Sequence, residues 1–293
     1  MAETNDSTPQ EQDAPAEPEV NGDATPANGN GPDPEEAASA NGKPVAVVSD
    51  IHANLEAWQA VLADIEQRKV ERIICLGDTL GYGPNPCECL DLLIEKCEWS
   101  LMGNHDFAVL YEPTSFNASA ESASFWTRQE LESEPDADVR ERRWVFLGGL
   151  EIRKTIGKSL YVHASPRRPI NEYIFPDDVI TAPEKIAQIF DRIDRVCYCG
   201  HTHVAGVFSD EPDFYPPGDI GDAYEFAPGE KCIINPGSLG QPRDRDARAA
   251  YAIVDDKHVE FVRVEYDIDA VMAKVNEVDQ LTDFLGQRLM EGR

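Results

Sequence analysis

Short β-branched runs alternate with amphipathic segments early in this chain, and that alternation constrains the fold more than any other feature. Asn54 is placed to cap a helix that runs to about Arg68, with Leu55, Trp58, Leu62 and Ile65 on one face. A second helix is expected over residues 87–96. Three runs are typical of strands, at residues 45–49, 72–76 and 100–102. Strands that alternate with helices predict parallel βαβ units buried on both faces.

The second half of the chain has a different pattern. After helices expected at 115–133 and 138–147, the segments 151–155 and 159–163 flank an Ile-Gly-Lys turn and predict a β-hairpin. Further strands are expected at 196–199, 204–208, 231–234, 249–254 and 258–264, and later helices at 183–190 and 267–290. Residues 209–230 are acidic and rich in proline and aromatic residues, and a loop of that length is usually functional or mobile.

The composition divides the chain near residue 42. Residues 1–42 carry ten acidic residues, no basic residue, and Val20 as the only large apolar residue after Met1. Such a segment cannot bury enough surface to offset its ordering entropy, so we expect a disordered acidic tail. Residues 43–293 are expected to form one catalytic domain, since α/β domains of about 250 residues are common.

The charge and the cysteines exclude several classes of protein. Lys and Arg number 26 against 55 Asp and Glu, so the formal charge is −29, and −19 falls on residues 43–293. This acidity argues against general nucleic-acid binding. No stretch approaches the roughly 18 apolar residues of a membrane span, and the N-terminus resembles neither a secretory signal nor a transit peptide, which predicts a cytoplasmic protein. Seven scattered cysteines fit a reducing compartment, although Cys87 with Cys89 and Cys197 with Cys199 leave a zinc site as an alternative.

Metal-ligand residue types fall where the predicted strands end. These positions are Asp50 and His52, Asp78, then Asn104, His105 and Asp106, then His163, and finally His201 and His203. Binding crevices form at the carboxyl ends of strands in open α/β sheets. Each element alone has a plain structural alternative, such as a turn residue, a helix cap or a core histidine. Together they make a mixed nitrogen and oxygen site without thiolate, which favours Mn, Fe, Zn, Co or Ni over calcium.

The ordered motifs resemble the calcineurin-like metallophosphoesterase superfamily, and within it the small, stand-alone bacterial phosphoesterases. The resemblance covers about residues 44–264 and includes the segments 77–86, 163–167 and 235–243. It implies an α/β/β/α sandwich of two mixed sheets flanked by helices. It also implies two divalent metal ions, with manganese favoured. One would be bound by Asp50, His52 and His203, the other by Asn104, His163 and His201, and Asp78 would bridge them.

The resemblance further implies hydrolysis by a hydroxide that bridges two cations about 3.5–4 Å apart and attacks phosphorus in line with the leaving group. His105 is then the catalytic histidine, and Asp106 either orients its imidazole or only starts a helix. Arg167 and Arg243 are expected to bind the substrate phosphate, with surface salt bridges as the alternative. The Tyr82 ring either lines the cleft or packs its loop.

The resulting prediction is a metal-dependent phosphoric ester hydrolase. It would act on phosphomonoesters or phosphodiesters of small molecules or nucleotides, with no membrane partner and no general nucleic-acid binding. Two alternatives stay open at this point: a phosphoprotein Ser/Thr phosphatase, and a catalytically silent metal-binding scaffold. The sequence does not indicate the oligomeric state, the physiological substrate or the native metal.

Overall fold

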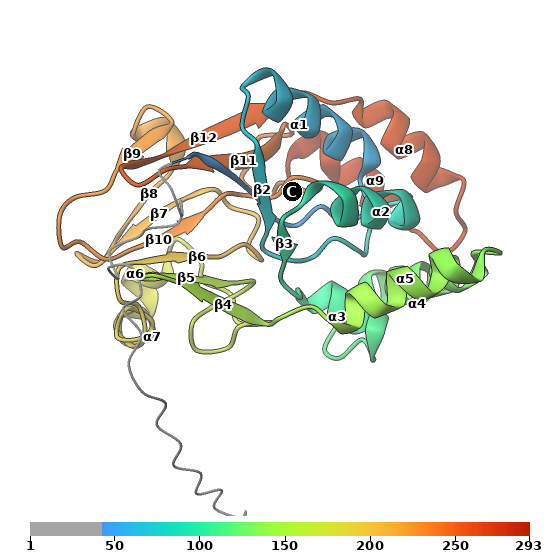
Figure 1. Cartoon of the computed structure of the whole chain (residues 1–293), viewed down its shortest axis with the longest axis horizontal. Coiled ribbons are helices and arrows are strands. Elements are labelled where there is room, and N and C mark those ends of the chain that lie inside the picture. Colours follow the sequence, from blue (N-terminus) through green and yellow to red (C-terminus); the bar gives the residue numbers. More distant parts are fainter. Residues whose placement is uncertain (1–42) are drawn as a thin grey trace, which may run out of the picture. The chain divides into compact units, whose positions relative to one another are not determined.

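The computed structural model describes residues 43–293, so the predicted disordered tail over 1–42 lies outside the described residues. The first of two six-stranded sheets has the order β3-β2-β1-β11-β12-β9 (Figure 1). Its strands are β1 (Val45–Val48), β2 (Arg72–Cys75), β3 (Trp99–Ser100), β9 (Ala223–Glu225), β11 (Ala249–Val254) and β12 (His258–Val264). β1, β2 and β3 are parallel neighbours, which confirms the predicted βαβ units, and β11 pairs antiparallel with β1.

The second sheet has the order β4-β5-β6-β10-β7-β8. Its strands are β4 (Arg153–Ile156), β5 (Ser159–Val162), β6 (Val196–Tyr198), β7 (Gly206–Ser209), β8 (Asp213–Tyr215) and β10 (Cys232–Asn235). The predicted hairpin is present as β4 and β5, but its turn is tighter than expected. Ile156 pairs with Ser159, so only Gly157 and Lys158 form the turn, and Gly157 adopts a φ of +56°.

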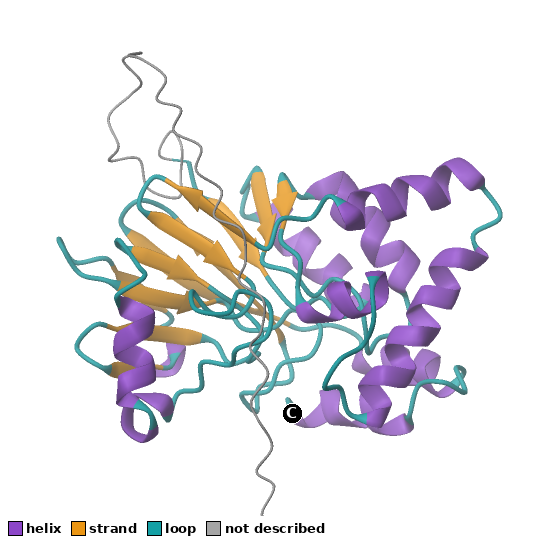
Figure 2. Cartoon of the chain, turned by 90° about the horizontal axis from the view of Figure 1, so that it is seen from below, coloured by secondary structure: helices purple, strands orange, loops and turns teal. Residues whose placement is uncertain are grey.

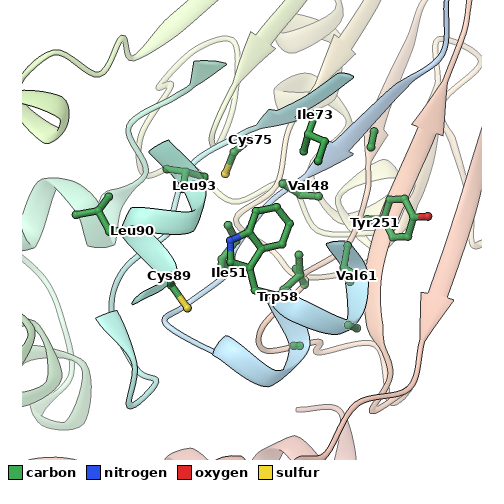
Figure 3. Close-up of a cluster of buried hydrophobic side chains, with 14 of the residues drawn as sticks. Val48, Ile51, Trp58, Val61, Ile73, Cys75, Cys89, Leu90, Leu93 and Tyr251 are labelled. Carbon is green, nitrogen blue, oxygen red and sulfur yellow. The ribbon is translucent and has the colours of Figure 1, made fainter. Parts of the chain in front are cut away.

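Side chains on β1 alternate between two cores. Val45 and Val47 point between the sheets and pack with residues of the second sheet such as Tyr198 and Ile234. Ala46 and Val48 point to the opposite face, where helix α1 (Leu55–Gln67) and helix α2 (Pro86–Lys96) cover the sheet. Figure 3 shows the Trp58 ring of α1 at the centre of the core between the first sheet and these two helices. The Asn54 side chain caps α1 as predicted, because its Oδ1 accepts a hydrogen bond from the Ala57 amide at 3.1 Å.

Helices complete the outer layers. α7 (Pro183–Phe190), preceded by α6 (Asp178–Thr181), packs Ile186 and Ile189 on the outer face of the second sheet. The predicted α/β/β/α sandwich of two mixed sheets is therefore confirmed. Further helices gather on one side of the sheets in Figure 2; they are α3 (Asn104–Leu110), α4 (Ala118–Ser133), α5 (Ala137–Gly148), α8 (Ile268–Asn276) and α9 (Asp283–Gln287). No helix within residues 43–293 is both long and apolar enough to span a bilayer.

The interpretation of residues 209–230 as one long loop is wrong. This segment contains β8, which pairs with β7 at the edge of one sheet, and β9, which pairs with β12 at the edge of the other. Each strand has only three residues, and the Pro216, Pro217 and Gly218 run between them hides the strand pattern. Aromatic side chains such as Tyr215 and Tyr224 pack partly against the core between the sheets, which explains their presence in an acidic segment.

Candidate metal centre

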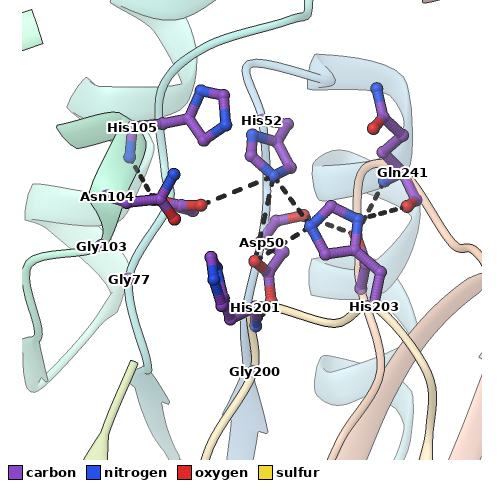
Figure 4. A network of polar contacts seen from close by, with 12 residues as sticks. Asp50, His52, Gly77, Gly103, Asn104, His105, Gly200, His201, His203 and Gln241 are labelled. Atoms are coloured by element: carbon purple, nitrogen blue, oxygen red, sulfur yellow. Dashed lines mark hydrogen bonds and ion pairs between the residues drawn. The ribbon is translucent and has the colours of Figure 1, made fainter. Parts of the chain in front are cut away.

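The side chains predicted as ligands lie directly after strands or at the start of a helix. Asp50 and His52 follow β1, Asp78 follows β2, and Asn104 begins α3. On the second sheet, His163 follows β5, and His201 and His203 follow β6. All but Asn104 are buried. The structure brings these seven residues, together with His105, into one cluster. Figure 4 shows Asp50, His52, Asn104, His105, His201 and His203 of this cluster.

The backbone at these positions adopts a conformation that residues other than glycine rarely show. Five of the seven predicted ligands have positive φ values between 49° and 66°: Asp50, His52, Asp78, His201 and His203. Left-handed backbone costs about 1–3 kcal/mol at each such residue and concentrates at functional sites. The positive φ values turn the backbone sharply where it leaves each strand, and the turns direct the side chains toward a common centre.

Two glycines make the close approach possible. A Cβ atom at Gly103 would lie 2.0 Å from Oδ1 of Asp78, and one at Gly200 would lie 2.4 Å from Oδ2 of Asp50. Neither distance is compatible with a side chain. The glycines of the two motifs therefore allow backbone to pack directly against the two carboxylates.

The first group of donor atoms comprises Asp50, His52 and His203. Nε2 of His203 lies 3.2 Å from Oδ1 of Asp50, and Nε2 of His52 lies 3.2 Å from Nε2 of His203. Figure 4 shows the imidazoles of His52 and His203 pointing toward the Asp50 carboxylate. This group matches the ligand set that the resemblance implies for one cation.

The second group comprises Asp78, His163 and His201, with Asn104 beside it. Nε2 of His163 lies 3.2 Å from Oδ2 of Asp78 and 3.1 Å from Oδ1 of Asn104. Oδ2 of Asp78 is also 3.8 Å from Nε2 of His52, in the first group. Asp78 therefore lies within 4 Å of a ring nitrogen in each group.

Backbone carbonyls orient the imidazoles of the first group. Nδ1 of His52 is 3.0 Å from the carbonyl oxygen of Leu80, and Nδ1 of His203 is 2.6 Å from that of Gln241. A carbonyl only accepts, so each Nδ1 donates its hydrogen, and each Nε2 of the neutral ring presents a lone pair to the centre. Two lone pairs 3.2 Å apart cannot share a hydrogen bond. Oδ1 of Asp50 and Nε2 of His201 are also buried without a partner. A divalent cation in each group would satisfy these atoms, and the donor set therefore fits divalent metal ions.

Burial and charge set the protonation of the cluster. Burial opposes ionisation of Asp50 and Asp78, but neighbouring imidazoles outweigh it, so the pKa of each carboxyl falls below its usual value. Burial and the charge of His163 lower the pKa of His201 to about 3. Burial alone would also lower the pKa of His163, but Asp78 and Asp50 raise it to about 9. His163 therefore has to release a proton when a cation binds.

His105 lies against the first group, and it forms a third group of possible metal donors with His52 and Asp78. Its ring is 4.8 Å from the His52 ring, burial lowers its pKa to about 4, and its Nδ1 has no hydrogen-bond partner. Within residues 43–293 the structure shows no hydrogen bond between Asp106 and this imidazole. The Asp106 carboxylate instead accepts hydrogen bonds from the backbone amides of Asp78, Leu80 and Gly103, at 2.8, 3.1 and 3.1 Å. These hydrogen bonds join the loop of Asp78 to the start of α3. They favour the alternative that Asp106 starts a helix.

The two predicted phosphate-binding arginines have different surroundings. The Arg167 guanidinium pairs with Glu172 at 2.8 Å and with the Gln188 side chain, which favours the salt-bridge alternative. Arg243 forms no ion pair within the described residues, its Nε is buried without a partner, and its guanidinium lies 5.8 Å from the centre of the Tyr82 ring. The Tyr82 ring is 4.7 Å from that of His52, so Tyr82 lines the site.

Several neighbours of the cluster were missed by sequence reasoning. Arg288 lies close enough to Arg243 that burial and the Arg243 charge lower its pKa to about 10. The Tyr173 ring stacks on that of His201 at 3.9 Å, and Phe116, expected inside a helix, precedes α4 and packs 4.6 Å from the His105 ring. These contacts join segments far apart in the chain, and no local pattern identifies them.

The alternative of a cysteine zinc site gains no support. All seven cysteines are unpaired, five of them buried, and burial raises the pKa of thiols such as Cys197 and Cys89. Within residues 43–293, the groups of side chains placed to hold a metal contain aspartate and histidine but no cysteine.

The fold and the cluster together define an α/β two-sheet protein with a buried centre of carboxylate, imidazole and amide donors. The comparisons with known proteins agree with this class. The calcineurin-like phosphoesterase superfamily domain matches residues 44–258, and the chain belongs to that superfamily. Its members are metal-dependent, so the cluster is the candidate metal centre.

Three relatives illustrate the similarity. An uncharacterized protein of Methanocaldococcus jannaschii is 38% identical over 254 residues, which cover 85% of this chain and 98% of that protein. A metallophosphoesterase of Sphaerobacter thermophilus is 36% identical with a TM-score of 0.72, covering 86% of this chain and 99% of the other. A hypothetical protein of Pyrococcus horikoshii has the same fold, with 21% identity, a TM-score of 0.64, and coverage of 85% and 98%.

Proposed function

We propose that this protein is a dinuclear metal-dependent phosphoesterase that hydrolyses phosphomonoesters or phosphodiesters of small molecules or nucleotides. One observation carries the proposal. The Asp78 carboxylate lies within 4 Å of a ring nitrogen in each of two groups of buried donors, and the first group holds facing imidazole lone pairs with no hydrogen between them. Such a centre, in a chain of this superfamily, is suited to two divalent cations, with manganese as the first candidate.

Two cations in such a centre supply an activated water and neutralise charge on the phosphate oxygens. In the proposal, Asp50, His52 and His203 hold one cation, Asn104, His163 and His201 hold the other, and Asp78 holds both. The carbonyl groups of Leu80 and Gln241 keep the imidazoles of the first set in the tautomer that binds metal. Asp106 fixes the loop of Asp78 relative to α3 through backbone amides.

His105 is the candidate for proton transfer to the leaving oxygen. It is buried next to His52, and its Nδ1 is free of any other hydrogen bond. Arg243 is the candidate phosphate clamp, because its guanidinium has no carboxylate partner and faces Tyr82 beside the centre. A guanidinium can bind two phosphate oxygens at once.

The test is metal-dependent turnover on a panel of substrates. The full-length chain is stripped with a chelator, reloaded with Mn²⁺, Fe²⁺, Zn²⁺, Co²⁺ or Ni²⁺, and assayed with p-nitrophenyl phosphate, bis-p-nitrophenyl phosphate, nucleotides and phosphopeptides. We expect turnover of small esters that disappears with chelation and returns with metal. Activity confined to phosphopeptides would favour the Ser/Thr phosphatase alternative. Two bound metals without any turnover would favour the silent scaffold.

A further inference from the structure

A cavity of about 500 Å³ adjoins the second donor group. Asn104 and His201, both proposed ligands of one cation, form part of its wall. Its volume falls within the range of about 300–1,000 Å³ that is usual for small-molecule sites. A phosphate held at the cluster would therefore have room beside it for the group that it esterifies.

Aromatic rings form much of the remaining wall. Phe107 comes from α3, Phe116 from the segment before α4, and Tyr173 from the loop after β5. Tyr173 stacks on the His201 ring at 3.9 Å and on the Phe175 ring at 5.1 Å, and 39% of its surface is still exposed. Phe116 packs against His105. Rings that pack against the catalytic cluster and also face the cavity can hold a planar group at a fixed position beside the phosphate.

Polar groups complete the lining of the cavity. Arg168, Asn171, Thr114, Ser115 and the Glu112 carboxylate supply donors and acceptors, and the Arg168 guanidinium forms no ion pair within the described part of the chain. Ser115 has a φ of +63°, a strained conformation for a residue other than glycine. Strained loop residues cluster at ligand sites. The combination of aromatic walls and a few polar groups is that of a pocket for a flat ring with hydrogen-bonding edges.

We infer that this cavity binds the nucleobase of a nucleotide substrate, with Phe107 and Phe116 as the stacking surface and Tyr173, stacked between His201 and Phe175, as part of the wall. The inference rests on the proposed function for the position of the phosphate. Bases stack on aromatic side chains whatever their identity, and stacking is worth roughly 5- to 150-fold in affinity per base. An aliphatic leaving group would leave the ring faces unused.

The test measures binding of a nucleoside that carries no phosphate. The full-length chain, supplied with Mn²⁺, is titrated calorimetrically with adenosine, and with ribose as the ring-free control. We expect the dissociation constant for adenosine to be at least about tenfold lower than for ribose. Phe116→Ala and Phe107→Ala should raise it by roughly 5- to 150-fold. Phe107→Leu, which keeps apolar volume but removes the ring, should also weaken adenosine binding.

Phe125→Ala is the matched control, because Phe125 is an exposed ring on α4 outside the cavity lining, and its adenosine affinity should equal that of the wild type. Equal binding of adenosine and ribose, or equal effects of Phe125→Ala and Phe107→Leu, would overturn the inference. Adenosine binding does not require hydrolysis. A chain that binds adenosine in the expected pattern but turns over no phosphoester would support the nucleobase site and refute only the proposed function.

Discussion

Replacing Asp78 by asparagine tests the shared carboxylate at the centre of the cluster. The Asp78 side chain is buried, and its Oδ2 lies 3.2 Å from Nε2 of His163 and 3.8 Å from Nε2 of His52. Asparagine keeps the shape and keeps an oxygen at the position of Oδ1, which accepts a hydrogen bond from the His105 amide at 2.7 Å. The substitution therefore removes one charge and leaves the local structure in place.

The expected loss follows from that charge. A pair of unit charges about 4 Å apart interacts by about 4 kcal/mol at an effective dielectric constant of 20, which corresponds to roughly a thousandfold in affinity. Since Asp78 lies within 4 Å of a nitrogen in each group, a cation in either group would lose this attraction. Asp78→Asn should lower bound metal from about two per chain toward one or none, and should reduce turnover more than any other single ligand change.

Metal content by plasma emission spectroscopy and turnover of bis-p-nitrophenyl phosphate measure both effects on the same sample. Asp178→Asn is the control, because Asp178 is a buried carboxylate paired with Lys185 at 2.6 Å, at α6, outside the cluster. It should keep metal and turnover. Two tightly bound metals and full activity in Asp78→Asn would refute the shared-ligand reasoning.

Three further predictions address the other parts of the account. His105→Ala should retain metal but lose about 10²- to 10⁴-fold in turnover number, with a smaller loss for p-nitrophenyl esters than for alkyl esters. Loss of metal in this variant would identify His105 as a ligand. In the metal-free protein the folded-state pKa of His163 is raised to about 9 from 6.5, so its pairing with Asp78 stabilises the fold fully below pH 6.5 and is lost as pH rises through 9. The melting temperature should fall over that window, and a His163→Gln variant should lack this fall. Deletion of residues 1–42, which carry ten acidic residues and no site motif, should leave turnover number and metal content unchanged and lower KM only at low salt; a folded, metal-loaded but inactive truncation would show that the tail supplies part of the site.

The parallel βαβ units were predictable because local patterns carry that information, whereas the two-sheet layering was implied by the family resemblance. The alternation of Val45 and Val47 with Ala46 and Val48 reflects two cores on either side of one strand. The short edge strands β8 and β9 were missed because their local pattern is too short to be informative. Three residues at a sheet edge, between prolines and glycine, contain too little alternation to predict a strand, and only their pairing with β7 and β12 defines them.

The donors of the site were visible in the sequence because their residue types and spacing are unusual at strand ends. Their supporting groups were not. The carbonyls of Leu80 and Gln241 orient imidazoles, and a carbonyl has no residue type that a sequence could reveal. The hydrogen bonds of Asp106 could not be predicted because its partners are backbone amides, including one of a distant loop. The aromatic contacts of Phe116 and Tyr173 depend on tertiary packing alone.

The central claim is that two cations at this cluster make the protein a phosphoesterase. Titration of the metal-free, full-length chain with Mn²⁺, with turnover of bis-p-nitrophenyl phosphate followed at each addition, tests it most directly. The account predicts no turnover without metal and a rise that saturates at about two equivalents per chain. Turnover that does not depend on metal, or no turnover on any phosphoester of the panel with two equivalents bound, would contradict it.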